Sequence, residues 1–301
     1  MTMRSGFVSL LGRPNAGKST LLNRLVGAHL AIVSDKPQTT RTRILGAKNL
    51  PEGQILFLDT PGVHRPMHRM NVRMVDAAVG AAREADVVAL VIDASEEVGR
   101  GTEFLLGLLP QLSQPVVLVL NKIDRMKKHT LLPAIEWFSG RYAFADVVPV
   151  SAATGDNVEV LEQVLLSHLP EGPPLYPDDY LSDQSARSLA AEMVREQVLA
   201  LTRAELPFTT AVVVDRYEEP EDDQEGPLAI YCSILVEEPS QKPILVGRGG
   251  EMIKAIGTAA RKQIEAFFER RVYLDLHVKV REDWRQNDRT LDDLGLQKRR
   301  R

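Results

Sequence analysis

The sequence predicts an α/β protein in which a doubly wound, mostly parallel sheet is followed by a smaller α+β domain. Three observations lead to this prediction. Short apolar runs alternate with helical patterns over residues 1–170, a proline-rich stretch follows, and a different order of helices and strands fills residues 185–301. A chain of 301 residues is long enough for two such domains.

The composition is that of an ordinary globular protein and excludes several classes. Hydrophobic residues make up 44% and charged residues 26%, which excludes a disordered chain. The single cysteine, Cys232, excludes a disulfide scaffold, suits a reducing cytosol, and is best interpreted as a buried small apolar residue. The net charge of −4 means that a nucleic-acid partner would need a local basic patch. No apolar run approaches the roughly 18 residues of a membrane span.

The strands of the first domain are predicted from apolar runs with little polar alternation. Such runs are typical of strands that helices cover on both faces, as in a parallel sheet with crossover helices. The runs are Phe7–Leu11, Ile55–Leu58, Val87–Ile92, Val116–Leu120 and Val147–Val150.

The stretch Leu169–Asp183 carries four prolines and no periodicity, so we expect a linker at 171–184. Beyond it, the pattern predicts a helix, two strands joined by the acidic loop 217–227, a short helix near Ser240, a long helix and a last strand. The predicted ranges are 185–201, 209–216, 228–236, 251–270 and 272–280.

The segment after the first strand fits G-x-x-x-x-G-K-S and opens a helical pattern, which is the context that this phosphate-binding motif requires. Its backbone N–H groups and the helix N-terminus favour phosphate oxygens. Lys18 is expected to neutralise the β- and γ-phosphates and Ser19 to bind Mg²⁺. The predicted contact residues here are Gly12, Asn15, Ala16, Gly17, Lys18, Ser19 and Thr20.

Three further polar segments follow later strands. Asp59-Thr-Pro-Gly62 is expected to reach Mg²⁺ through Asp59 and the γ-phosphate through the Gly62 N–H. Asn121-Lys122-Ile123-Asp124 places a carboxylate where it can accept two hydrogen bonds from the N1–H and N2 amine that guanine has and adenine lacks. Asn121 is expected to bond the N7/O6 side of the base, the Lys122 stem to pack along the base plane, and Ser151-Ala152 to offer a backbone N–H to O6.

These four segments, each at the carboxyl end of a strand, resemble the translation-factor-like P-loop GTPases. The resemblance implies that a loop threonine completes the Mg²⁺ shell, and we choose Thr40, with Thr39 as the alternative. It also implies that Asn15 can hold a potassium ion, although Asn15 could instead only stabilise the loop. We expect Lys18, Thr40, Gly62 and Asn15 to act in hydrolysis.

Two residues near the third segment limit the chemistry. Ras-type enzymes have a water-orienting glutamine after the glycine, where this chain has Val63, so we expect slow hydrolysis without a partner. His64 and His68 are four residues apart, but Pro66 lies between them and no further ligand completes a set. We therefore interpret both histidines as switch-loop residues rather than metal ligands.

The second domain contains a G-x-x-G turn between apolar helical segments, which is the loop of KH RNA-binding modules. Between Lys242 and Arg281, nine Lys or Arg residues stand against four Asp or Glu, so the surroundings are locally basic. We expect RNA contacts from Gly247, Arg248, Gly249, Gly250, Lys254, Ile244 and Ile253; Val246 and Ile256 could also line the groove, although core packing is the default role of all four apolar residues.

Together, both halves resemble the Era-like GTPases, in which a GTPase domain precedes a type II KH domain. The segments that carry the resemblance are 12–20, 36–41, 59–62, 121–124, 247–257 and 280–285. It implies a monomeric GTP/GDP- and Mg²⁺-dependent switch that binds the 3′ end of 16S rRNA during 30S assembly, in the cytoplasm and loosely at the inner membrane. The alternative is an RNA-binding GTPase acting on another structured RNA, or in cell-cycle or membrane-linked signalling. The loop 217–227 and the basic tail 298–301 depart from the family pattern.

Overall fold

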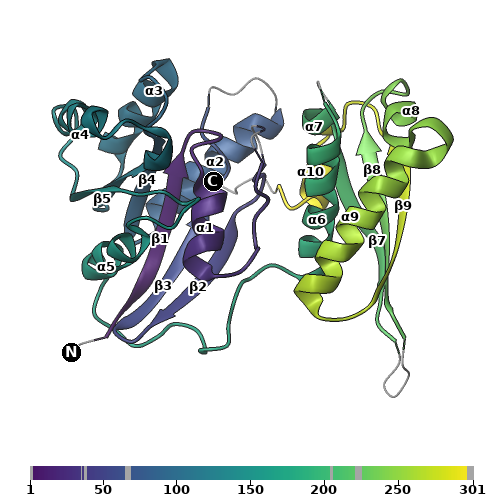
Figure 1. The fold of residues 1–301 in the computed structure, drawn as a ribbon, viewed down its shortest axis with the longest axis horizontal. Helices are drawn as coiled ribbons and strands as arrows, with labels where there is room; N and C mark the ends of the chain where they lie inside the picture. Colours follow the sequence, from purple (N-terminus) through teal and green to yellow (C-terminus); the bar gives the residue numbers. More distant parts are fainter. Residues whose placement is uncertain are drawn as a thin grey trace. The chain divides into compact units, whose positions relative to one another are not determined.

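The computed structural model describes residues 3–34, 36, 39–64, 69–203, 206–220 and 226–296, and its chain divides into two compact units (Figure 1). The first unit contains two long segments of the chain, Met1–Ala31 and Pro37–Asp183. The second unit begins at Gln184 and also includes the short segment Ile32–Lys36. The division after Asp183 falls inside the proposed linker, whereas nothing in the sequence pattern indicates that Ile32–Lys36 belongs to the second unit.

The first unit is built on a six-stranded sheet with the order β2-β3-β1-β4-β5-β6. All neighbouring strands are parallel except β2, which runs antiparallel to β3. The doubly wound sheet predicted from the sequence is therefore confirmed. The strands are β1 (Arg4–Gly12), β2 (Ile44–Leu50), β3 (Gly53–Asp59), β4 (Val87–Asp93), β5 (Val116–Asn121) and β6 (Asp146–Pro149).

Helices cover both faces of this sheet because its central strands are apolar on both sides (Figure 1). One face packs against α2, α3 and α4 in a buried cluster that includes Leu11, Leu90 and Phe138. In Figure 1, α1 and α5 lie in front of the sheet, over its other face. The helices are α1 (Lys18–Val26), α2 (Arg69–Glu84), α3 (Arg100–Leu108), α4 (Leu131–Ser139) and α5 (Val158–His168), with short 3-10 turns at Leu109–Gln111, Ile123–Arg125 and Lys128–Thr130.

The proline-rich stretch is bonded to the first unit along much of its length. The side chain of Gln54 donates to the Tyr176 carbonyl and accepts from the Leu175 N–H. Farther along, the Ala47 N–H donates to the Leu181 carbonyl at 2.9 Å. The segment therefore extends the edge of the sheet beside β2 instead of crossing open solvent.

The second unit has a three-stranded sheet, β7-β8-β9, in which β8 is antiparallel to β7 and parallel to β9. Helices α6 and α9 supply Val194, Val198, Ile256 and Ile264 to its buried cluster, and Cys232 is fully buried there too. The elements are α6 (Ala186–Leu201), α7 (Leu206–Thr209), β7 (Ala211–Glu218), β8 (Leu228–Val236), α8 (Gln241–Val246), α9 (Glu251–Phe268), β9 (Val272–Val280) and α10 (Asp288–Asp293), with 3-10 turns at Arg248–Gly250 and Trp284–Gln286. This arrangement confirms the predicted α+β domain.

Two sequence expectations lie partly or wholly outside the described residues. Residues 221–225 of the acidic loop 217–227 and the whole basic tail 298–301 are among them. Within the part of the chain that the structure describes, no helix is both long and apolar enough to span a membrane.

Candidate functional site: a nucleotide pocket and a glycine turn

The phosphate loop runs from Gly12 at the end of β1 to Lys18 at the start of α1. Lys18 is buried, and its Nζ donates to the carbonyl oxygens of Gly12 at 3.3 Å and Arg13 at 3.1 Å. Burial lowers the pKa of the Lys18 ammonium, and the nearby Asp59 carboxylate raises it in part. A phosphate group arriving in this loop would supply further negative charge, so the site favours an anionic ligand.

Three of the proposed metal-site residues meet beside Lys18. The Ser19 hydroxyl lies 2.8 Å from Asp59 Oδ2 and the Thr40 hydroxyl lies 3.0 Å from the same atom. The two hydroxyl oxygens are 2.8 Å apart. The structure thus places the hydroxyl of Thr40, the first choice of the sequence analysis, in one cluster with the other two groups.

The chemistry of this cluster fits a small divalent cation. Asp59 is fully buried, and its Oδ1 atom has no hydrogen-bond partner among the described residues. Burial raises the pKa of Asp59, while Lys18 and the bonds from Ser19 and Thr40 lower it. A magnesium ion prefers oxygen ligands and would stabilise the ionised carboxylate, so these hydroxyls and this carboxylate are suited to hold it.

The segment after β3 lies directly on the phosphate loop. The N–H of Val63 donates to the Gly12 carbonyl at 3.0 Å, and the Val63 side chain is buried in the core. His64 Nδ1 lies 3.0 Å from the Gly62 carbonyl oxygen, so this histidine bonds locally to the switch segment. His68, which we interpret from the sequence as a second switch-loop residue, lies outside the described residues.

Asn121 joins the phosphate loop to the loop that carries Ala152 after β6. Its Nδ2 donates to the Ala16 carbonyl at 2.9 Å, and its Oδ1 accepts from the Ala152 N–H at 3.0 Å. The sequence analysis expected Asn121 to bond the base and Ser151-Ala152 to offer a backbone N–H to O6. In this structure the Asn121 side chain bonds both Ala16 and Ala152, so it joins the loops that follow β1 and β6.

Asp124 is oriented by the hydroxyl group of Ser151. Ser151 Oγ donates to Asp124 Oδ1 at 2.6 Å, while the aspartate itself is exposed. The loop that carries Ser151 is also held by Arg24 on α1, whose guanidinium donates to the carbonyls of Ala152 at 3.2 Å and Ala153 at 2.6 Å. Sequence reasoning missed Arg24, because nothing in its spacing from residues 152–153 indicates contact.

The second candidate site is the glycine turn between α8 and α9. Gly247 and Gly249 both have positive φ, 76° and 60°, but they differ in the space around the Cα atom. A Cβ on Gly247 would lie 2.7 Å from the Met252 backbone nitrogen, whereas a Cβ on Gly249 would meet nothing within 4 Å. Gly247 is therefore required by local packing, and Gly249 presents open backbone to a ligand.

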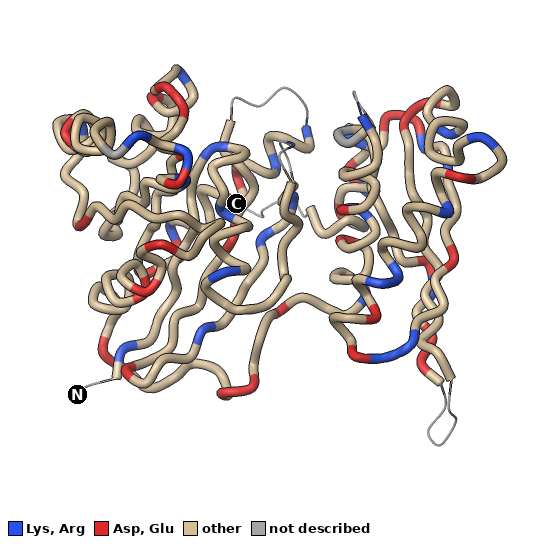
Figure 2. The backbone as a smooth tube through the Cα atoms, viewed as in Figure 1, with Lys and Arg blue, Asp and Glu red and all other residues tan. Residues whose placement is uncertain are grey.

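The side chains around the turn divide between surface and core. Arg248 and Lys254 are exposed, and Ile244 keeps 52% of its surface exposed. Ile253 is half-buried, and Ile256 is fully buried in the core. Figure 2 marks basic positions at the turn before α9 and again beyond its end, mixed with acidic ones. Ile244 thus remains available to a ligand, Ile253 packs partly against the core, and Ile256 has its default core role.

Comparisons with known proteins give a family match for each of the two domains. Residues 7–122 match the family described as a 50S ribosome-binding GTPase, and residues 216–285 match the KH domain family. The chain is 48% identical to the GTPase Era of Geotalea daltonii, over 97% of this chain and 98% of that protein. It is 47% identical to the GTPase Era of Geobacter metallireducens, over 97% of each.

Two solved structures are similar over nearly the whole chain. One is Era in complex with MgGDPNP and nucleotides 1506–1542 of 16S ribosomal RNA, with a TM-score of 0.94, 40% identity, and coverage of 98% of this chain and 99% of that one. The other is a single-residue variant of Aquifex aeolicus Era bound to GDP and AlF4⁻, with the same TM-score and identity over 98% and 100%.

Proposed function

This chain belongs to the Era family of GTPases, and from that membership we propose that it binds the 3′ end of 16S ribosomal RNA and acts in the assembly of the 30S subunit. One observation carries the proposal: the candidate nucleotide site and the open glycine turn occur in one chain that is similar, over 98% of its length, to an Era in complex with MgGDPNP and 16S ribosomal RNA. The chain is accordingly a GTPase, and its nucleotide state is proposed to control the RNA site.

We propose the following roles in hydrolysis for this chain's own residues. Lys18 neutralises the β- and γ-phosphates, and the Gly62 N–H meets the γ-phosphate. Ser19, Thr40 and Asp59 would hold magnesium, which shields the phosphate charge when bound. Val63 is apolar and buried, so it cannot orient the attacking water, and turnover is slow without a partner.

Potassium is the proposed stimulating ion, with Asn15 as its ligand. Asn15 lies in the phosphate loop with a left-handed φ of 63°, and its side-chain oxygen is buried. Phosphate release in potassium and sodium buffers of equal ionic strength tests this role. Faster turnover in potassium, lost in Asn15→Ala, supports it, and equal turnover in the two buffers refutes it.

RNA binding at the glycine turn is best tested at Gly249. Because this position is open and has positive φ, which aspartate tolerates better than most residues, Gly249→Asp adds a negative charge with little disturbance of the fold. We expect this variant to lose binding to a 16S 3′-end fragment while keeping GDP affinity. Gly99→Asp, also in open space but in the first unit, is the matched control. Undiminished RNA binding by Gly249→Asp would refute the proposed site.

The segment Ile32–Lys36 supports coupling between nucleotide and RNA. Within the second unit, Lys36 Nζ donates to the Leu199 carbonyl and, at 2.6 Å, to the Thr202 carbonyl at the end of α6. The Val33 N–H also donates to Glu196 on α6 at 3.0 Å. Thr40 follows Lys36 by four positions. We therefore propose that nucleotide binding, which orders Thr40, changes the hydrogen bonds of Val33 and Lys36 described above.

Lys36→Ala tests the coupling separately from either binding site. We expect the variant to bind RNA with the same affinity in its GDP and GTP-analogue states, whereas the unaltered protein distinguishes them. Lys127→Ala removes an exposed lysine of the first unit and should leave the difference intact. If Lys36→Ala retains the full difference, the attachment does not transmit the nucleotide state.

The 30S subunit and the inner membrane are the remaining proposed partners. Cosedimentation with 30S particles that depends on Gly249 would support the first. Flotation with anionic vesicles, absent with neutral vesicles, would support loose membrane association of an otherwise cytoplasmic protein.

A further inference from the structure

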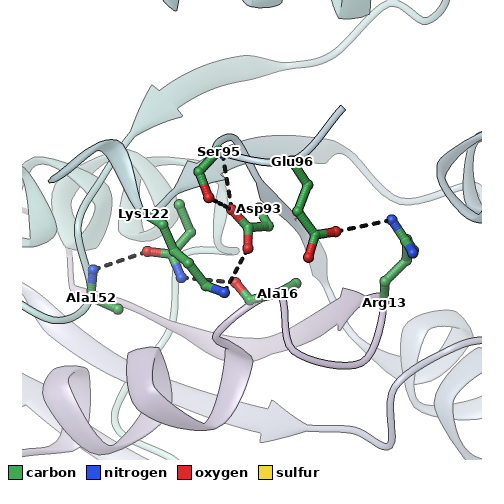
Figure 3. Close-up of polar contacts among 8 residues, drawn as sticks. Arg13, Ala16, Asp93, Ser95, Glu96, Lys122 and Ala152 are labelled. Atoms are coloured by element: carbon green, nitrogen blue, oxygen red, sulfur yellow. Dashed lines mark hydrogen bonds and ion pairs between the residues drawn. The ribbon is translucent and has the colours of Figure 1, made fainter. Parts of the chain in front are cut away.

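The turn at the end of β4, residues 93–96, contacts the motif Asn121–Asp124 through Asp93, which is the last residue of the strand and is not part of the sequence motifs (Figure 3). Lys122 Nζ donates to Asp93 Oδ2 at 2.6 Å. The other carboxylate oxygen, Oδ1, accepts from the Ser95 N–H at 2.9 Å and the Ser95 hydroxyl at 2.6 Å. Both oxygens of Asp93 are thus bonded, and its orientation is fixed.

The sheet register explains why these residues meet. Asp93 is directly opposite Asn121 in the parallel pair of β4 and β5. The Ala94 N–H extends this pairing by donating to the Asn121 carbonyl at 2.9 Å. Lys122 then has a left-handed φ of 65°, and its side chain turns back toward Asp93.

The pair is well shielded from water. The Asp93 side chain is 8% exposed and that of Lys122 is 21% exposed. Burial alone would raise the pKa of Asp93, but the bonds from Lys122 and Ser95 outweigh it and lower the pKa. Removal of one member of such a pair leaves the other charge poorly solvated.

A second ion pair from the same turn provides a contrast. Glu96 contacts Arg13 of the phosphate loop at 3.3 Å, but these side chains are 54% and 36% exposed. Exposed pairs of this kind contribute little, because water and salt screen them. Of the two acidic residues, Asp93 is therefore the one whose loss should disturb its partner strongly, because its ion pair is the less exposed.

The stem of Lys122 lies beside the phosphate loop. Its Cε atom is 3.8 Å from the position that a Cβ on Gly17 would occupy. The ammonium is held at Asp93, so the stem is fixed between Asp93 and the Gly17 position of the phosphate loop. The sequence analysis expects the plane of the base to pack along this stem.

We propose that Asp93 is a positioning residue for guanine-nucleotide binding, acting by holding the Lys122 stem under the base. The inference rests on the proposed nucleotide site. It implies that Asp93 supports stacking of the base and does not read its edge. Loss of Asp93 should therefore weaken guanine and hypoxanthine nucleotides equally, since they differ only in the 2-amino group.

Release of GDP and IDP from Asp93→Ala and Asp93→Asn tests this role. For Asp93→Ala we expect release of both nucleotides to accelerate by the same factor, about tenfold or more, because truncating a shielded charge pair raises the off-rate. Asp93→Asn should fall between this variant and the unaltered protein, with kcat at saturating GTP within about twofold. Glu96→Gln, from the same turn, should release both nucleotides at the original rate.

A double-mutant cycle separates positioning from a general structural role. In a Lys122→Ala background, Asp93→Ala should cause no further acceleration, because its effect passes through Lys122. The inference is overturned if Asp93→Ala releases GDP at the original rate, if it affects GDP much more than IDP, or if its effect persists without Lys122. Failure of the unaltered protein to bind GDP would instead refute the proposed nucleotide site.

Discussion

Gly62 lies so close to Pro14 that a side chain at position 62 would have no space. A Cβ on Gly62 would lie 2.6 Å from the Pro14 nitrogen and 2.7 Å from its Cα. The neighbouring bond from the Val63 N–H to the Gly12 carbonyl joins the same two segments. The segment that is proposed to sense the γ-phosphate is therefore in direct contact with the loop that is proposed to hold it.

Gly62→Ala should consequently impair turnover. The added methyl group meets backbone, which cannot rotate away, so the two segments must separate at a cost of about 1–3 kcal/mol. We expect kcat for GTP to fall roughly ten- to hundredfold in a phosphate-release assay, with a smaller loss of GDP affinity. Gly107→Ala, at an open position in α3, should hydrolyse GTP normally. Normal turnover by Gly62→Ala would show that this contact is dispensable.

Asp124→Asn should change the base that the pocket selects. The amide keeps one acceptor oxygen but replaces the other with an NH2 donor. The N1–H and 2-amine of guanine are both donors, so only one of them can still be bonded. Loss of a charged hydrogen bond costs about 1.5–3 kcal/mol, so GDP affinity should fall roughly ten- to hundredfold. Xanthosine diphosphate, which has a carbonyl in place of the amine, should bind the variant better than it binds the unaltered protein. Competition against a fluorescent GDP analogue measures both affinities, and an unchanged preference for guanine would exclude Asp124 as the selecting group.

The first domain was predictable to the extent that its information is local. Buried parallel strands are continuous apolar runs, and the phosphate loop has fixed spacing, so both are visible in the sequence. Strand β2 was missed because Ile44–Leu50 mixes apolar, glycine and polar residues, and its conformation is set by pairing with β3. The Asp93–Lys122 and Arg24–Ala153 contacts were also missed, because they join residues far apart in the chain.

Cys232 should behave as an internal reporter of the second unit. Its side chain is fully buried, and burial raises the pKa of its thiol to about 12. The unreactive thiol form therefore persists in the folded state at neutral and moderately alkaline pH. The contribution of the buried thiol to the free energy of unfolding declines only as the pH rises from about 9 toward about 12. We expect negligible alkylation of the native protein at about pH 8 and rapid reaction in urea. Rapid alkylation of the native protein would contradict the buried placement.

Trp284→Phe should destabilise the second unit selectively. The fully buried indole donates its Nε1–H to the Thr209 carbonyl at 2.8 Å, and phenylalanine removes this bond. We expect the free energy of unfolding of this unit to fall by about 1–3 kcal/mol, so that Cys232 becomes reactive at lower urea. Trp137→Phe, in the first unit, should leave the urea dependence of Cys232 alkylation unchanged. An unaltered urea dependence in Trp284→Phe would mean that the bond contributes nothing.

The most direct test of the whole account is the affinity of the intact protein for a nonhydrolysable GTP analogue and for GDP, each measured with and without a saturating 16S 3′-end fragment. Because coupling between two sites is reciprocal, the RNA should change the ratio of the two nucleotide affinities by about fivefold or more. Gly249→Asp should abolish that change. An identical ratio with and without RNA would contradict a switch in which guanine nucleotide governs the RNA site.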